Sequence, residues 1–424
     1  MAGLVGQTLM GIADTLMVGQ VGVIPLAASS LVINLFHLPM VFGFGMLTSV
    51  SVLTATAFGA KDPMQAGRVY RASAILTIAM GVILVAVFMT FRWILPFLGQ
   101  PVEVVESAGG YLWYLALSLL PMLIGLTGKQ FCEALNHPWI PTLLMIGGVL
   151  LNVVLNWMFI YGNLGCPAMG LEGAGLATLL ARIVTAVAII GWLMRSDSLA
   201  RFRQGAWRDA EDRPVLMRLF KLGLPVSFQH LMEMGSFAFA ALMLGWIGTN
   251  ALAAHQIAFT CASTTFMFSL SLGMAASVRV GQALGAGLKR RVRRIGWISF
   301  TMAVIVMSGF GCLFFFGGKT IVSWFVDSGE VQFLAVQLLM VAAVFQIFDG
   351  LQVTAISMLR GMQDVRMPAI VAIVAYWLMA IPLACLLAFY YKMGAFGIWI
   401  GLAVGLGTAA VCLTARFHFK TRDT

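Results

Sequence analysis

Charge is scarce in this chain. Of its 424 residues only 10% are Asp, Glu, Lys or Arg, whereas 61% are hydrophobic, and the mean hydropathy is +0.96. A soluble domain has about 25% charged residues. The composition therefore excludes a water-soluble globule of this length and indicates a protein that crosses a membrane several times.

Several catalytic signatures are also missing. The chain has no Walker A pattern, no GxSxG and no HExxH, so no motif supports nucleotide-driven pumping, serine hydrolysis or zinc proteolysis. The six cysteines include no CxxC pair and mostly fall in or beside apolar stretches. That placement predicts packing roles rather than disulfides or metal ligands. We expect neither an enzyme nor a resident cofactor.

Long apolar runs are what the chain has instead. A helix that spans a bilayer needs roughly 20 residues. Runs of about that length lie at residues 2–18, 26–58, 72–97, 111–131, 139–161, 171–194, 220–247, 252–284, 295–316, 333–358, 368–391 and 398–413. The prediction is an all-α integral membrane protein with twelve transmembrane helices. The second and eighth runs are long enough to tilt or bend.

The two halves of the chain repeat each other. The pattern GxxGxxxLAA at residues 19–28 returns 226 positions later, and Met169-Gly170 returns as Met393-Gly394 after a two-residue gap. Six runs per copy mean that both copies enter the membrane from the same side, which predicts two parallel six-helix repeats. The expected parts are an amino-terminal lobe, a cytoplasmic linker and a carboxy-terminal lobe, at 1–194, 195–219 and 220–424. Duplicated bundles of this kind are typical of transporters.

Basic residues mark one side of the membrane. Most of the 26 Lys and Arg residues fall in loops that follow even-numbered runs, in the expected linker or in the tail. Cytoplasmic loops are enriched in Lys and Arg, so we expect a multi-pass protein of the inner (plasma) membrane with both termini in the cytoplasm. The first run shows no basic leader and no small-residue cleavage site, so we expect no cleaved signal peptide.

The net charge of +10 does not require a nucleic-acid partner. The cluster at residues 289–294 holds five basic side chains but has no aromatic platform beside it for stacking bases. Orientation and contact with lipid headgroups explain such a cluster. We expect membrane lipids, but no nucleic acid, as partners, and a monomeric protein.

Three acids lie inside the apolar runs. Asp14 is in the first, Glu233 in the seventh and Asp349 in the tenth. A carboxylate at membrane depth costs about 2.5–3.5 kcal/mol on insertion scales, so it normally faces the bundle interior and has a function. The functional interpretation is a site that exchanges H+, Na+ or a cationic substrate. A structural acid near a helix end remains the alternative.

Polar side chains near these acids extend the candidate site. Asn152 and Asn156 stand four residues apart and so share one face of the fifth helix. Their carbonyl oxygens could ligate Na+, or their amides could bond to Asp14, and a plain interhelical hydrogen bond is an equal alternative. His230 lies three residues before Glu233, but a lone histidine more often serves packing.

Five motifs together resemble one transporter family. They are Gly11-Ile12-Ala13-Asp14-Thr15, Leu252-Ala253-Ala254-His255-Gln256-Ile257, Val280-Gly281-Gln282-Ala283-Leu284-Gly285-Ala286, Asp349-Gly350-Leu351-Gln352 and Gly170-Leu171-Glu172-Gly173-Ala174-Gly175. Over almost its whole length the chain resembles the multidrug and toxic compound extrusion (MATE) transporters, in their NorM-like branch. The resemblance implies a two-lobed secondary active antiporter that expels cationic or amphipathic drugs in exchange for Na+ or H+ by alternating access.

The resemblance also implies roles for residues. It places Asp14, Asn152 and Asn156 in an amino-terminal site, and Glu233 and Asp349 in a carboxy-terminal site that binds the coupling cation, with Na+ as a candidate metal. The chain departs from the family in its short first helix and in Phe345, where a polar aromatic is expected one turn before Asp349. The coupling ion is therefore left open between Na+ and H+.

Two other functions remain. A lipid-linked oligosaccharide flippase would need buried basic side chains for its pyrophosphate. Arg182 and Arg279 are the only basic residues expected well inside helices, and Arg279 is near a cytoplasmic end. An uncoupled channel or receptor is the second alternative, against which the duplication is weak evidence.

Overall fold

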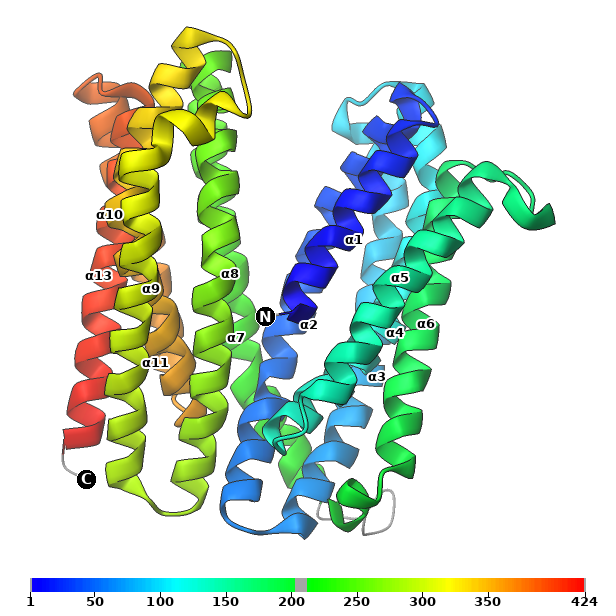
Figure 1. Ribbon diagram of the computed structural model, residues 1–424, viewed down its shortest axis with the longest axis vertical. Coiled ribbons are helices and arrows are strands. Elements are labelled where there is room, and N and C mark those ends of the chain that lie inside the picture. The colour runs from blue at the N-terminus through cyan, green and yellow to red at the C-terminus, as the bar shows by residue number, and fades with distance from the viewer. Residues whose placement is uncertain (1, 203–211, 423–424) are drawn as a thin grey trace. The chain divides into compact units, whose positions relative to one another are not determined.

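The computed structural model describes residues 2–202 and 212–422, except for the side chains of residues 2–9, 12 and 98. Within these ranges every regular element is helical (Figure 1). All twelve predicted apolar runs are helical, which confirms the fold class. Eleven of the described helices are long and apolar enough to cross a membrane; the 18-residue α1 (Ala2–Gly19) is outside that set.

The chain divides into two compact units, Met1–Ser227 and Phe228–Thr424. In the first unit α1 is followed by α2 (Val23–Gly59), α3 (Pro63–Ile94), α4 (Val102–Ala134), α5 (Trp139–Tyr161) and α6 (Leu171–Arg195). Their apolar faces form two clusters of buried side chains, one on α2, α3 and α4 around Leu47 and Phe131 and one around Phe88 and Leu112. The second unit is built the same way.

In the second unit α8 (Thr249–Gly285), α9 (Lys289–Ser323) and α10 (Gly329–Gly361) precede an irregular span, and α13 (Gly394–Arg422) ends the chain. The span consists of α11 (Arg366–Ile373), the π-helical η4 (Val374–Ala380), α12 (Ile381–Cys385) and the π-helical η5 (Leu386–Tyr390). Pro382 stands at the start of α12 and cannot donate a helical hydrogen bond. A local π-helical path beside a proline is one way in which membrane helices satisfy the freed backbone groups.

The expected linker is partly helical. Helix α7 (Asp212–Ile247) begins inside the range 195–219, while residues 203–211 lie outside the described part of the chain. The start of α7 packs on the first unit, because Leu219 is fully buried in its core and Ser227 donates a hydrogen bond to the Phe42 carbonyl at 2.7 Å. The boundary between the units accordingly falls at Ser227, past residue 219.

The sequence repeat is visible in the backbone. Gly22 and Gly248, which are 226 positions apart, precede α2 and α8 with φ, ψ of 155°, 172° and 151°, 167°. Only glycine enters this region without strain. Gly170 and Gly394, which are 224 positions apart, likewise have positive φ values of 56° and 58° at the starts of α6 and α13. Both lobes therefore begin corresponding helices with the same glycine geometry.

Candidate functional site

In the second unit an acid on α7 meets a tyrosine on the π-helical segment. The Tyr376 hydroxyl lies 3.0 Å from Oε1 of Glu233 and 2.9 Å from Oε1 of Gln352 on α10. Tyr376 and Gln352 are both fully buried. Trp377, the next residue of η4, donates its indole N–H to the Met232 carbonyl at 3.0 Å. Two adjacent side chains of η4 thus hold it against α7 around Glu233.

A second acid lies beside this group without a partner of its own. Asp349 on α10 is 5% exposed and makes no hydrogen bond or ion pair with any residue that the structure describes. Its charge interacts with that of Glu233. Buried carboxylates are normally hydrogen-bonded or paired. A buried carboxylate without a partner, near a second acid, can accept a cation or a proton.

A buried base lies close to Glu233. Arg360, near the end of α10, donates from Nη2 to Oε1 of Gln229 at 3.2 Å, and both side chains are buried. His230 Nδ1 lies 3.9 Å from Oε2 of Glu233, which is too long for a hydrogen bond. The structure therefore places His230 beside Glu233 but shows no direct bond between them.

The polar aromatic side chain that is expected at position 345 is provided by a different span, η4. Phe345 is 5% exposed and packs in the same apolar cluster as Tyr376, which comes from η4 rather than from α10. A hydroxyl therefore reaches Glu233 although position 345 cannot provide one. The internal repeat of the sequence could have pointed to Tyr376 as the counterpart of Asn152. Tyr376 lies 224 positions after Asn152, the same offset that relates Met169 to Met393.

In the first unit the predicted residues also meet. Asn156 on α5 donates from Nδ2 to Oδ1 of Asp14 on α1 at 2.5 Å and to Oδ1 of Asn152 at 3.2 Å. Asn152 in turn donates to the Thr178 hydroxyl on α6 at 3.3 Å. Both asparagines are fully buried, and Oδ1 of Asn156 has no partner among the described atoms. A chain of hydrogen bonds thereby joins α1, α5 and α6.

A tyrosine fixes the position of α1 close to this acid. The Tyr161 hydroxyl at the end of α5 lies 3.0 Å from the Met17 carbonyl and 2.8 Å from Oε1 of Gln20. Because α1 is short and packs mainly on α5, these contacts hold the turn of α1 that follows Asp14. The two lobes use a common plan. In each, an acid on the first helix of the repeat is bonded to a side chain on the fifth span.

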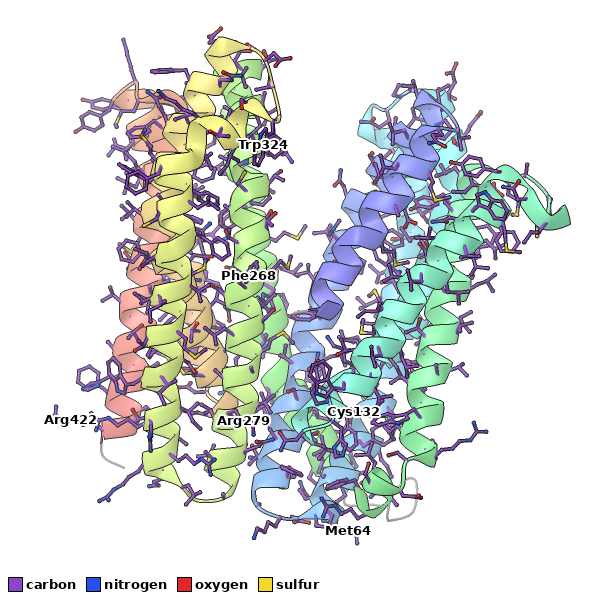
Figure 2. The ribbon with its side chains drawn as sticks, in the orientation of Figure 1. Met64, Cys132, Phe268, Arg279, Trp324 and Arg422 are labelled. Atoms are coloured by element: carbon purple, nitrogen blue, oxygen red, sulfur yellow. The ribbon has the colours of Figure 1, made fainter. Side chains whose placement is uncertain are left out.

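Buried bases are more numerous than the sequence indicated. The expectation that Arg182 and Arg279 are the only basic residues well inside helices is wrong. Arg71 in α3, Lys129 in α4 and Arg360 in α10 all lie within helices and are 3–7% exposed. Hydropathy assigns Arg71 and Arg360 to loops because α3 begins before its apolar run and α10 continues past its own, whereas Lys129 lies within the last turn of the run 111–131. Arg279, by contrast, is exposed near the end of α8 (Figure 2).

The comparisons with known proteins cover nearly the whole chain. The MatE family model matches residues 1–158 and 225–386. A protein named "Probable multidrug resistance protein NorM" from Mesorhizobium japonicum is 36% identical over 98% of this chain and 91% of its own length. The chain belongs to the MatE family. A "Multidrug resistance protein NorM" from Burkholderia vietnamiensis is 34% identical over 98% of the chain and 90% of that protein.

Solved structures show the same MATE fold. A MATE crystal structure in the bent conformation matches with a TM-score of 0.91 over 100% of this chain and 93% of that one, at 22% identity. An outward-facing multidrug resistance MATE family transporter matches with a TM-score of 0.89, also at 22% identity and with coverage of 100% and 93%. As a MatE protein the chain is a transporter and not an enzyme.

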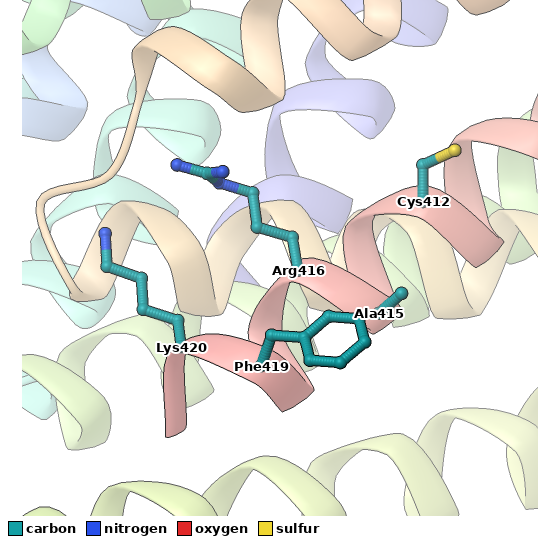
Figure 3. A pocket seen from close by; sticks show the side chains of 5 residues that line it. All are labelled: Cys412, Ala415, Arg416, Phe419 and Lys420. Atoms are coloured by element: carbon teal, nitrogen blue, oxygen red, sulfur yellow. The ribbon is translucent and has the colours of Figure 1, made fainter. Parts of the chain in front are cut away.

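The described residues of this MatE chain contain no group of three or more His, Cys, Asp or Glu side chains that would hold a metal. Glu233, Asp349 and the Tyr376 hydroxyl nevertheless offer two carboxylates and a neutral oxygen, which are ligand types that a hard cation takes. A surface hollow at the end of α13 is basic rather than acidic, because Arg416 and Lys420 line it together with Phe419 (Figure 3). It is not a cation site.

Proposed function

We propose that this protein is a secondary active antiporter that expels cationic or amphipathic drugs and toxic compounds in exchange for Na+ or H+ by alternating access. The proposal is supported by membership of the MatE family and by relatives that carry the name of multidrug resistance proteins. The observation that carries it is Asp349, a buried carboxylate without a partner beside Glu233. A pair of acids in an apolar bundle is a site for positive charge.

Exchange follows from competition for this charge. The ring centroid of Phe237 lies 6.2 Å from that of Tyr376. When the site faces the cytoplasm, ionised Glu233 and Asp349 attract a lipophilic cation, while aromatic side chains such as Phe237 cover its apolar body. When it faces outward, Na+ or H+ binds the carboxylates and displaces the drug. Two ligands that compete for one site are coupled without a separate relay, because each lowers the occupancy of the other.

Either coupling ion fits the chemistry of the group. A proton needs a single carboxylate oxygen, and Asp349 offers one without breaking an existing bond. Sodium needs several hard oxygen ligands, which Glu233, Asp349 and Tyr376 can provide together with water. In the first lobe, we assign Asp14, Asn152 and Asn156 to a second cation or substrate site on the same grounds.

The membrane arrangement is part of the proposal. Bacterial relatives and the basic cluster at residues 289–294 support insertion in the plasma membrane with both termini in the cytoplasm. We propose that the functional unit is a monomer in contact with membrane lipids, because each acid group is built within one lobe of a single chain.

The test is ethidium efflux from reconstituted liposomes, with a Na+ gradient and a pH gradient imposed separately. The variants are Asp14→Asn, Glu233→Gln and Asp349→Asn, with Asp327→Asn as a control because that side chain is exposed in the loop before α10. We expect one gradient to drive efflux, and Glu233→Gln and Asp349→Asn to abolish it. Intact efflux in Glu233→Gln would remove this acid from the mechanism. Absence of efflux under both gradients would contradict the antiporter and favour a flippase or a channel.

A further inference from the structure

The basic hollow at the end of α13 has no part in the exchange described above. The residues that line it recur at intervals of three and four and so share one face of the helix, namely Cys412, Ala415, Arg416, Phe419 and Lys420. The side chains of Arg416 and Lys420 point the same way, and the ring of Phe419 points in another direction (Figure 3). The hollow therefore combines two bases with an apolar wall.

The two bases share a single acid. Nε of Arg416 and Nζ of Lys420 both donate to Oδ2 of Asp364, at 2.8 and 2.9 Å. The Asp364 side chain is 8% exposed, whereas those of Arg416 and Lys420 are 34% and 41% exposed. Two positive charges face one negative charge, so one positive charge remains uncompensated. It lies on the exposed side of the group, because the acid is the buried member.

Hydrogen-bond donors also remain on this side. A guanidinium has five N–H donors and an ammonium group has three. The structure gives Arg416 one hydrogen bond, from Nε, and the Nη atoms of Arg416 have no partner among the described residues. Arg71 shows the contrast, because Nε and Nη2 of Arg71 bind both oxygens of Asp212. The fork of Arg416 is thus not closed on its acid, and it can bind a second anion.

The face continues as an apolar surface along α13, which is long and apolar enough to cross a membrane. Phe419 and Val411 are both 64% exposed, and Val404 is 41% exposed. Val404, Val411 and Ala415 follow each other at intervals of seven and four, so they lie on one side of the helix. A basic end therefore meets an exposed apolar stripe of a length that an acyl chain can follow.

The hollow lies at the basic end of the second lobe. Helix α9 begins at Lys289 with the basic cluster at residues 289–294, and its first turns pack on the last turns of α13. The ring centroids of Trp297 and His418 are 6.0 Å apart. The turn between α8 and α9 and the end of α13 are accordingly at the same end of this lobe (Figure 1). The surrounding charge favours an anion.

We propose that this hollow binds an anionic phospholipid, with the phosphate at Arg416 and Lys420 and an acyl chain along Phe419, Ala415 and Val411. A guanidinium fork matches two phosphate oxygens, and an ammonium group adds a point charge. Basic recesses beside membrane helices are typical sites for anionic headgroups. The proposal does not depend on which compounds the protein exports.

The charge balance selects the headgroup. A phosphodiester with one negative charge compensates the one positive charge that Asp364 leaves on Arg416 and Lys420. Phosphatidylglycerol carries this charge. In phosphatidylethanolamine the ammonium group cancels the phosphate and would approach the two bases. The hollow should therefore prefer the first lipid to the second.

Native mass spectrometry of the purified full chain in detergent tests the proposal, with titrations of dioleoyl phosphatidylglycerol and dioleoyl phosphatidylethanolamine. We expect the parent to bind phosphatidylglycerol at least about fivefold more tightly, and Lys420→Gln to lose about fivefold, the contribution of one basic side chain near a charged lipid. Asp364→Asn should bind phosphatidylglycerol more tightly than the parent by a similar factor, because both bases are then uncompensated. The two variants thus shift affinity in opposite directions, which a general loss of folding cannot produce.

Two exposed bases serve as matched controls. Arg290→Gln removes a charge from the basic cluster, and Lys319→Gln removes one at the other end of α9. Both should bind phosphatidylglycerol as the parent does. A loss in Arg290→Gln equal to that in Lys420→Gln would overturn the proposal in favour of diffuse attraction.

Three other results would also contradict it. Equal affinity of the parent for the two lipids would show that the hollow does not select charge. Unchanged affinity in Asp364→Asn would show that Arg416 and Lys420 serve only their ion pair. Displacement of phosphatidylglycerol by an equal concentration of inorganic phosphate would show that the apolar wall contributes nothing and that the ligand is a soluble anion.

Discussion

Tyr376 and Glu233 are joined by a hydrogen bond of 3.0 Å between two spans of the second lobe. A hydroxyl carries one proton, so Tyr376 donates to one acceptor at a time, although Oε1 of Gln352 is also within 2.9 Å. Nε2 of Gln352 has no partner in the described structure. If the amide of Gln352 turns over, Nε2 donates to the tyrosine oxygen and the tyrosine proton serves Glu233. The bond then favours ionised Glu233, the form that binds a cation.

Removal of this hydroxyl should change how efflux depends on the coupling ion. In Tyr376→Phe, ionised Glu233 no longer accepts a hydrogen bond from the hydroxyl. A hydrogen bond to a charged group is worth about 1.5–3 kcal/mol, which corresponds to roughly tenfold to a hundredfold in affinity for the coupling ion. If Na+ is the coupling ion, we expect the Na+ concentration at half-maximal drug release to rise by that factor. If H+ is the coupling ion, we expect the H+ concentration at half-maximal release to fall, because loss of the bond favours protonated Glu233. The measurement is drug efflux against outside Na+ and pH. The control is Tyr390→Phe, at an exposed position in η5, which should behave as the parent. An unchanged ion dependence in Tyr376→Phe would show that the hydroxyl does not act on Glu233.

The helices and the three acids could be predicted from the sequence, because hydropathy marks the helices and a buried charge is costly. The run 139–161 coincides with α5, and the three acids were identifiable because an apolar span rarely tolerates a carboxylate without a function. Hydropathy underestimates helices that continue beyond the bilayer. Helix α9 begins at Lys289 and not at residue 295, and α10 continues to Gly361, so Arg360 was assigned to a loop. Tyr376 was missed because the π-helical path that aims it at Glu233 depends on tertiary packing.

The glycines before α2 and α8 should be the most sensitive backbone positions of the repeat. In Gly22→Ala or Gly248→Ala an added Cβ meets no atom closer than 3.6 Å, so the cost comes from the positive φ and not from a clash. We expect each change to lower the free energy of unfolding by about 1–3 kcal/mol, visible as a lower midpoint of thermal unfolding in detergent. Gly109→Ala, in open space within α4, should be neutral or slightly stabilising. Equal effects at all three positions would contradict the argument.

Asp364, in the loop between α10 and α11, should make stability depend on pH. It accepts from Nε of Arg416 at 2.8 Å and from Nζ of Lys420 at 2.9 Å. Burial alone would raise the pKa of this carboxyl, but the hydrogen bonds and charges of Arg416 and Lys420 lower it further, so the net pKa is below its usual range. A lowered pKa in the folded state stabilises the protein above the unfolded pKa, about 3.9, and this contribution disappears as the pH falls through the folded pKa.

The matching experiment compares thermal unfolding of the parent and of Asp364→Asn. We expect the variant to unfold at a lower temperature at pH 7, and the difference between the two proteins to narrow as the pH falls below about 4. Asp327→Asn, at an exposed position with no ion pair in the described structure, should match the parent at every pH. A difference that grows toward acid pH would have the wrong sign for a lowered pKa.

The ion pair of Arg71 and Asp212 should hold the start of α7 on the first lobe. The two side chains are 3% and 4% exposed and meet in two hydrogen bonds of 3.1 Å. Loss of one partner leaves a buried charge, so we expect Arg71→Met or Asp212→Leu to cost about 3–5 kcal/mol of unfolding free energy. The double variant should recover much of this loss, because no charge is then left unpaired. Denaturant unfolding in detergent measures all four proteins as one cycle.

The cycle separates a true ion pair from two independent packing effects. If the pair acts as a unit, the loss in the double variant is well below the sum of the single losses, whereas independent sites would add to within about 0.5 kcal/mol. Arg195→Met, exposed at the end of α6, serves as the surface control and should change stability by no more than about 0.5 kcal/mol. Limited proteolysis adds a local readout. Cleavage near residue 212 should accelerate in the single variants before global unfolding, because this pair ties the beginning of α7 to α3.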